Sequence, residues 1–206
     1  MAIGTVITAD IVNSTQLPKA VFNKLVKTIE SLMGTHKFEF YRGDSFQVYM
    51  KDNEKALNLL LQIRLAAIRI ENETGSIDVR AGIGIGHVKA PIRILKTSGE
   101  EPFVISGLNL DSLSGNDRLR INSFNDKANC AFQTIAPFLD YILKRLTAKQ
   151  AGVLFELWMG HNQTEIAKKL KKSQVTINKQ IHAADWQIID RILFQYKHTL
   201  DQFNLK

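Results

Sequence analysis

The stretch Lys37–Met50 restricts the fold more than any other part of the sequence. Phe38 and Phe40 alternate with polar residues before the turn Arg42-Gly43-Asp44, and the same alternation resumes after it. A period of two is typical of a β-strand with one buried face, and a Gly-Asp pair between two such runs is typical of a hairpin turn. The stretch therefore predicts a β-hairpin.

Apolar patterns on both sides of the hairpin predict further strands and helices. We expect strands at Gly4–Val12, Ile77–Val88 and Arg118–Phe124, an irregular arm at Lys89–Glu101, and helices at Pro18–Met33, Asp52–Asn72, Pro102–Leu113 and Asp126–Leu146. Strands joined by helices, with one hairpin in the middle, predict an α/β layer on a mixed sheet of the ferredoxin-like kind.

Three alternating glycines mark one face of the strand at residues 77–88. Gly82, Gly84 and Gly86 leave that face without side chains, so another backbone must approach it closely. Their spacing differs from the dinucleotide-binding fingerprint and they lie within a strand. Close packing of a helix on the sheet is the favoured interpretation.

The C-terminal part reads as helical, and Asn162–Trp186 predicts two helices joined by a tight basic turn. Asn162 and Glu165 form a capping box, as Thr147 and Gln150 do earlier. Ser173 is placed to N-cap a last helix that runs to about Phe194 or beyond. Its expected buried line is Ile177, Ile181, Ala184 and Ile188, and we expect Trp158 and Trp186 to anchor this core.

The open face of these two helices carries groups that suit contact with DNA. A short helix, a tight turn and a second helix with polar side chains near its start is the geometry of helix-turn-helix proteins. The expected contacts are Lys168, Lys169, Lys171, Lys172, Gln174, Val175, Asn178, Lys179 and His182. The alternative is a small helical bundle whose polar face is merely solvated. T-E-I-A-x-x-L followed by S-x-x-T-I resembles the helix-turn-helix of region four of sigma-70 factors and of LuxR-type regulators.

The distribution of charge favours the DNA-binding interpretation. Residues 144–206 hold 11 Lys and Arg against 5 Asp and Glu, whereas residues 1–143 hold 16 against 15. The net charge of +7 is therefore almost wholly C-terminal, as phosphate binding requires. We expect two domains, an α/β domain at residues 1–143 and a small all-α helix-turn-helix domain at residues 144–206.

Composition predicts a reducing compartment and no membrane span. Cys130 is the single cysteine, which excludes an internal disulfide, and we expect it to be a small core residue. The N-terminus alternates like a strand and lacks the pattern of a signal peptide, and no apolar run is long enough to span a membrane. We expect a cytoplasmic protein.

Asp10 and Asp44 follow a strand and a hairpin turn that we expect to share one edge of the sheet. Two convergent carboxylates suit a divalent metal such as Mg²⁺. The alternative is that Asp10 starts an Asx-turn and that Asp44 is an ordinary turn residue.

The context of both aspartates resembles class III nucleotide cyclases. Ala9–Thr15 (A-D-I-V-N-S-T) is similar to their first metal motif, F-x-D-I-x-x-(S/F)-T, and Tyr41–Phe46 (Y-R-G-D-S-F) to their hairpin motif. Val79–Gly86 (V-R-A-G-I-G-I-G) resembles their glycine-rich strand. The resemblance covers residues 4–124, and the whole chain resembles SatD-like bacterial proteins that join such a domain to a helix-turn-helix tail.

The resemblance implies a cyclase-like palm domain with Asp10 and Asp44 as metal ligands. It also implies a nucleotide beside Ile11, Asn13, Ser14, Thr15, Arg42 and Gly43, although Arg42 has the alternative of pairing with a carboxylate. Other cyclase positions differ: Phe40 stands where the family has a purine-selecting lysine, and Glu101–Gly107 has no clear partner aspartate. Asn116 and Arg120 have the spacing of the transition-state pair but fall in a predicted turn. A phosphoryl-transfer enzyme needs such cationic groups, so efficient turnover is not expected.

Together these features predict a DNA-binding transcriptional regulator with a degenerate cyclase-like sensor domain that binds a nucleotide or a divalent metal. Binding to a palindromic site as a homodimer is compatible with a single helix-turn-helix per chain. The first alternative is a metal-dependent nucleotidyl cyclase or nucleotidyltransferase with a regulatory helical tail. The second is a protein-interaction module whose basic tail docks on an acidic partner.

Overall fold

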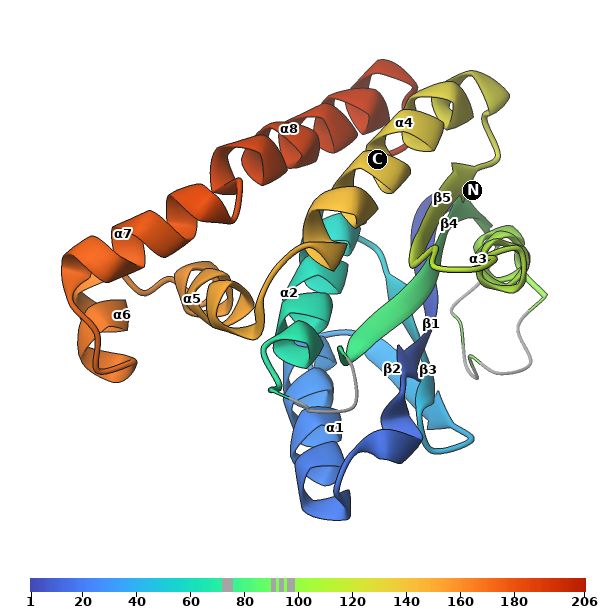
Figure 1. Cartoon of the computed structure of the whole chain (residues 1–206). Helices are drawn as coiled ribbons and strands as arrows, with labels where there is room; N and C mark the ends of the chain where they lie inside the picture. The colour runs from blue at the N-terminus through green and yellow to red at the C-terminus, as the bar shows by residue number, and fades with distance from the viewer. Residues whose placement is uncertain (72–75, 90–91, 93–94, 96–98) are drawn as a thin grey trace.

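Six elements of the N-terminal half form the βαββαβ arrangement that defines a ferredoxin-like fold. The computed structural model describes residues 1–71, 76–89, 92, 95 and 99–206. The elements are β1 (Ala2–Val12), α1 (Lys19–Met33), β2 (Lys37–Tyr41), β3 (Ser45–Met50), α2 (Ala56–Ile68) and β4 (Asp78–Val88) (Figure 1). The sheet order is β2-β3-β1-β4-β5, and the pairs β2–β3, β3–β1 and β1–β4 are antiparallel. This topology confirms the predicted α/β layer.

The fifth strand makes the sheet mixed. The helix α3 (Glu101–Asp111) leads to β5 (Leu119–Ser123), which pairs with β4 in parallel, and α4 (Asp126–Lys144) follows. Short 3-10 turns at Ser14–Gln16 and Asn53–Lys55 precede α1 and α2. Most of the arm predicted at residues 89–101 lies outside the described residues.

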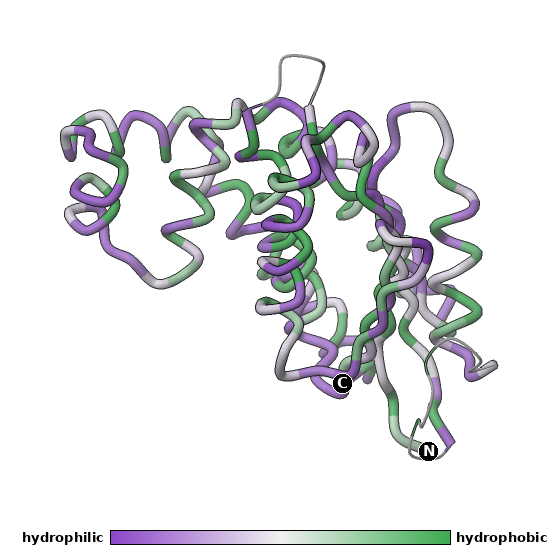
Figure 2. Tube along the Cα trace, turned by 90° about the horizontal axis from the view of Figure 1, so that it is seen from below, coloured by the Kyte–Doolittle hydropathy of each residue, from purple (hydrophilic) through white to green (hydrophobic). Residues whose placement is uncertain are grey.

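The two faces of the sheet are covered differently. On β1, Ile7, Ala9 and Ile11 face α1, α2 and α4 in the main core, while Thr8 and Asp10 face the side of α3 (Figure 1). Hydrophobic residues gather in the centre of the molecule, between the helical layer and the sheet (Figure 2). On the α3 side, Thr8 Oγ1 is hydrogen-bonded to Ser106 Oγ, and a cavity lies beside Asp10.

The glycines of β4 allow α3 to dock backbone against backbone, as predicted. A Cβ atom at Gly84 would lie 2.3 Å from the Pro102 carbonyl oxygen and 2.5 Å from the Ser106 nitrogen. At Gly82 it would lie 2.2 Å from the Ser106 carbonyl oxygen. Any side chain larger than hydrogen would push α3 off the sheet.

Four C-terminal helices continue the helical layer. They are α5 (Ala148–Trp158), α6 (Gln163–Lys169), α7 (Gln174–Ala183) and α8 (Trp186–Gln202). Tyr196 of α8 is buried and donates to the Asn53 carbonyl oxygen at 3.0 Å, and the Asn53 amide donates to the Leu205 carbonyl oxygen at 2.8 Å. The boundary predicted at residues 143 and 144 coincides with the end of α4, but α5 and α8 share one core with the sheet layer.

Three expectations for the helical part were wrong. The last helix is interrupted at Asp185, whose left-handed φ of 53° separates α7 from α8. The interruption shifts the helical register, so that Ile189 is buried and Ile188 is 36% exposed. Cys130 is exposed on α4 rather than packed in the core. Trp158 and Trp186 are partly buried and pack against the core, in keeping with the predicted role, and their rings contact each other edge to face with centroids 4.9 Å apart.

A buried ion-pair triad joins three elements of the fold. Arg64 of α2 is fully buried and binds Asp78 of β4 through two bonds of 3.0 and 2.6 Å. Its remaining nitrogen lies 2.9 Å from an oxygen of Asp140 on α4. Burial alone would lower the pKa of Arg64, but the two carboxylates raise it, so the guanidinium stays charged.

Across the described residues, no helix combines the length and the apolar character that crossing a membrane would require.

Candidate functional site

The backbones of Asp10 and Asp44 lie at the same end of neighbouring strands. Asp10 is opposite Ser45 in the pairing of β1 with β3, and the Ile11 amide donates to the Asp44 carbonyl oxygen at 3.1 Å. The strand β1 and the β2–β3 hairpin therefore bring together the two segments that the sequence singled out.

Their carboxylates have different partners. Arg80 lies directly opposite Asp10 in the pairing of β1 with β4, and its guanidinium binds both Asp10 oxygens, with nitrogen–oxygen distances of 2.7, 2.9 and 2.7 Å. Asp44 accepts a hydrogen bond from Ser14 Oγ at 2.7 Å. The two carboxylates are thus each engaged within the chain.

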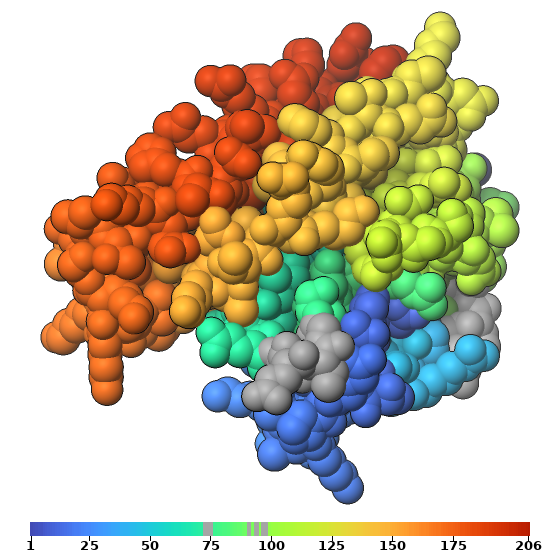
Figure 3. Space-filling model, in the orientation of Figure 1, coloured from blue at the N-terminus to red at the C-terminus, as the bar shows by residue number. Residues whose placement is uncertain are grey.

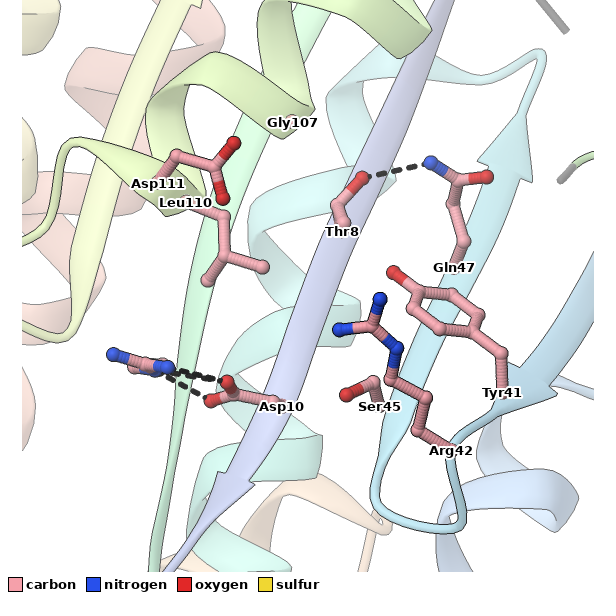
Figure 4. Close-up of a pocket in the computed structure, with 10 residues that line it drawn as sticks. Thr8, Asp10, Tyr41, Arg42, Ser45, Gln47, Gly107, Leu110 and Asp111 are labelled. Carbon is pink, nitrogen blue, oxygen red and sulfur yellow. Dashed lines mark hydrogen bonds and ion pairs between the residues drawn. The ribbon is translucent and has the colours of Figure 1, made fainter. Parts of the chain in front are cut away.

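A cavity of about 620 Å³ opens beside the Asp10–Arg80 pair, between the sheet and α3 (Figure 4). We call it the sheet pocket. Its walls are Thr8, Asp10, Tyr41, Arg42, Ser45, Gln47, Arg80, Gly107, Leu110 and Asp111.

The sheet pocket carries charges of both signs. Within the part of the chain that the structure describes, Arg42 and Asp111 have no ion-pair partner, whereas Arg80 and Asp10 neutralise each other. The hydrogen bond to Asp10 is the main cause that raises the pKa of Arg80, so this guanidinium stays protonated. Burial, followed by the charge of Asp10, raises the pKa of Tyr41, so the phenol remains a neutral donor. An anionic ligand would find Arg42 free to bind it.

The predicted nucleotide-binding residues divide between the pocket and its surroundings. Arg42 lines the sheet pocket, together with the predicted metal ligand Asp10. The other predicted nucleotide-binding residues do not line the sheet pocket. Ile11 is 3% exposed and packs in the core on the opposite face of the sheet. Asn13 donates to the Ser76 carbonyl oxygen at 3.1 Å, and Ser14 donates to Asp44. Thr15 and Gly43 also lie outside the lining.

The donor set at this edge does not fit a divalent cation as it is arranged. Among the described residues, no three His, Cys, Asp or Glu side chains gather in a way that could hold a metal. The guanidinium of Arg80 takes both oxygens of Asp10, where a cation would bind. The predicted Mg²⁺ at Asp10 and Asp44 therefore remains a prediction that requires Arg80 to release Asp10.

Apart from Asp10 and Arg42, the residues that line the sheet pocket were not predicted as site residues from the sequence. Arg80 precedes Gly82 by two residues on β4, so strand alternation places it on the glycine face, opposite Asp10. Gln47 donates to Thr8 Oγ1 at 2.9 Å across β3 and β1 (Figure 4), and strand alternation could have identified this pair as well. Asp111 could not have been found, because it depends on how α3 docks.

The second candidate site is formed by α6 and α7, at the end of the molecule away from the sheet (Figure 1), and Figure 3 shows the surface of this orange region. Both predicted caps are present: Asn162 and Glu165 form a capping box, and Ser173 Oγ accepts from the Thr176 amide at 3.1 Å. Ile166, Ile177 and Ile181 are buried against α5.

All nine residues predicted to contact DNA are exposed. We call them the basic surface: Lys168, Lys169, Lys171, Lys172, Gln174, Val175, Asn178, Lys179 and His182. Among the described side chains, Lys168, Lys171, Lys172 and Lys179 form no ion pair, so the ammonium groups of these four lysines face solvent without a carboxylate partner.

Lys169 differs from the other lysines of the basic surface. Its ammonium lies 2.7 Å from Glu156 of α5, a buried carboxylate that also approaches Arg69 of α2 and His161. Lys169 therefore joins α6 to α5 and to the helical layer of the sheet.

Comparisons with known proteins give structural likenesses only. No family model and no curated protein matches the sequence. An active GGEEF domain of a diguanylate cyclase from Vibrio cholerae is 17% identical, with 60% of this chain and 83% of that chain covered and a TM-score of 0.43. Adenylate cyclases from Trypanosoma brucei are 16% identical over 56% of this chain and 71% of theirs, with a TM-score of 0.43. A bacterial light-regulated adenylyl cyclase is 14% identical over 59% and 42%, with a TM-score of 0.38. With TM-scores below 0.5, the fold assignment rests on the strand topology.

Proposed function

We propose that this protein is a DNA-binding regulator whose basic surface contacts duplex DNA and whose sheet pocket binds an anionic ligand. One observation carries the proposal. The outward side of α7 presents an amide, an ammonium and an imidazole, at Asn178, Lys179 and His182, on a helix whose other side is buried. Amides and cations of this kind read base edges in the major groove.

The surrounding charges support the same proposal. Lys168, Lys171 and Lys172 lie at the end of α6 and in the turn, without partners among the described residues, so phosphates would meet ammonium groups that are already free of carboxylates. The free lysines would also attract an acidic protein partner, but binding of such a partner would not require the exposed amides of Gln174 and Asn178.

A paired substitution tests the proposal with a matched control inside the chain. The Asn-Lys pair at residues 178 and 179 recurs at Asn23 and Lys24, which are also exposed and also helical. Asn178→Ala with Lys179→Ala should lower retention on a pool of random-sequence duplexes and relax the sequences selected from it. Asn23→Ala with Lys24→Ala removes the same atoms and should change neither. An equal loss of duplex retention in both variants would show that net charge alone, and not the surface of α7, determines retention.

The nucleotide ligand belongs to the same proposal. The unpaired Arg42 and the neutral Tyr41 phenol in the sheet pocket support binding of a phosphate-bearing molecule. The rival function, metal-dependent nucleotidyl transfer by Asp10 and Asp44, would need Arg80 to move first. Calorimetric titration of a nonhydrolysable nucleoside triphosphate with and without Mg²⁺ separates the two, because only the rival requires the metal.

A further inference from the structure

Five described residues other than glycine have a left-handed backbone. They are Asn13, Arg42, Lys171, Asp185 and Asn204. Asparagine and aspartate tolerate this conformation, whereas other L-residues are strained in it. The two exceptions, Arg42 and Lys171, are both cations, and each lies in one of the two candidate sites.

The turn between α6 and α7 requires the left-handed conformation at Lys171. The Lys172 amide donates to the Ala167 carbonyl oxygen at 2.9 Å, and the Lys171 amide donates to the Lys168 carbonyl oxygen at 3.3 Å. This pair of bonds is a Schellman motif, in which glycine is the usual residue at the position that Lys171 occupies with φ of 52°.

Helix stability does not account for a lysine there. A cation near a helix C-terminus is favourable, but Lys168 and Lys169 already supply it in the last turn of α6. The Lys171 side chain is exposed and forms no ion pair within the described chain. No ion pair within the described chain therefore explains why this position carries a positive charge.

We propose that Lys171 is a phosphate contact of the basic surface, retained at a conformational cost where glycine would make the turn more stable. The inference rests on the proposed DNA binding and deepens it. In this proposal the turn between α6 and α7 contacts the phosphates of the DNA and so positions the protein, whereas α7 contacts the base edges.

Arg42 in the sheet pocket is, like Lys171, a cation with a left-handed backbone and no ion-pair partner among the described residues. It has φ of 56°, next to Gly43 with φ of 87°, in the hairpin turn, and its guanidinium has no carboxylate partner among the described residues. A glycine would suit this turn better. Arg42 is thus assigned to a phosphate group of the pocket ligand.

Substitution by glycine tests both assignments, because stability and binding should move in opposite directions. Lys171→Gly should raise Tm by about 2–4 °C, while weakening duplex binding and making the slope of log affinity against log salt shallower by about 1. Lys171→Asn, which suits the left-handed backbone, should bind as weakly as the glycine variant. Lys168→Ala removes a charge from an ordinary helical position and should make the slope shallower without raising Tm.

Asn204→Gly provides the control for the strained backbone alone. It lies at the C-terminal end in the same conformation and should change neither duplex binding nor its salt slope. For Arg42→Gly, the probe is tripolyphosphate: the variant should lose the thermal stabilisation that tripolyphosphate gives the unmodified chain.

The outcomes separate the two proposals. No duplex binding by the unmodified chain at low salt overturns the proposed function and the Lys171 assignment together. Binding by the unmodified chain with unchanged affinity and slope in Lys171→Gly overturns the Lys171 assignment alone, as does an unchanged or lower Tm. Equal stabilisation of Arg42→Gly and the unmodified chain by tripolyphosphate overturns the Arg42 assignment.

Discussion

Gly84→Ala tests the docking of α3, the helix that forms one wall of the sheet pocket. The added methyl carbon would lie 2.3 Å from the Pro102 carbonyl oxygen and 2.5 Å from the Ser106 nitrogen. Both are backbone atoms of a helix, so no side chain can rotate away to relieve the contact. Overpacking usually costs 1–3 kcal/mol, and we expect about 3 kcal/mol here because only a shift of α3 makes room.

Gly107→Ala is the matched control on the same helix. A Cβ atom at Gly107 would meet nothing within 4 Å. Alanine is the better helix former, so this variant should be more stable by about 0.5–1 kcal/mol. The same substitution therefore has opposite effects on stability at Gly84, which faces α3, and at Gly107, whose added methyl group would meet open space.

Urea denaturation followed by circular dichroism measures both variants. With a slope of about 2–3 kcal/mol per molar for a chain of this size, Gly84→Ala should lower the midpoint by about 1 M or more. Tripolyphosphate should also stabilise Gly84→Ala less than the unmodified chain, because a displaced α3 no longer closes the sheet pocket. A neutral Gly84→Ala would refute the backbone contact between α3 and β4.

Three further predictions address the rest of the fold. Arg64→Met removes the ion pair of the buried Asp78 and one of the two ion pairs of Asp140, which keeps Lys144, and should cost about 3–5 kcal/mol in urea denaturation. Ser173→Ala removes the N-cap of α7 and should cost about 1 kcal/mol, with loss of amide protection in the first turn of α7 by hydrogen exchange. Hydrogen bonds from Lys197 and Lys206 lower the pKa of Glu54, so its stabilising contribution is present above its unfolded-state pKa and is lost as the pH falls through the folded value. Carboxyl NMR titration should find the Glu54 pKa below its ordinary value and closer to normal in Lys197→Ala.

Local patterns in the sequence predicted most of the fold. The alternation around Arg42-Gly43-Asp44, the alternating glycines of β4 and the caps at Asn162 and Ser173 each depend on residues that are close in sequence. They were therefore visible without tertiary information, and so was the ferredoxin-like order that follows from them.

The predictions failed where the backbone conformation of a single residue, or contacts between residues far apart in sequence, determine the structure. Asp185 reads as an ordinary helical residue, but its left-handed backbone ends α7 and moves the buried position from Ile188 to Ile189. The sequence marks the break only weakly, because neither glycine nor proline is present and aspartate, which tolerates the left-handed conformation, is also common within helices. Asp111 joins the sheet pocket only through the docking of α3, and Glu156 holds Lys169 only because α5 and α6 cross.

The salt dependence of duplex binding by the full chain tests the central claim most directly. Four lysines of the basic surface are free of ion pairs within the described chain, so log affinity should fall linearly with log salt, with a slope of about −3 to −4 per chain. Anisotropy of a labelled duplex, measured from 20 mM salt upward (roughly the range in which counterion release dominates), gives this slope. A steep linear fall is the predicted result. Absence of binding at the lowest salt, or binding that salt does not weaken, would contradict the assignment of the basic surface to DNA.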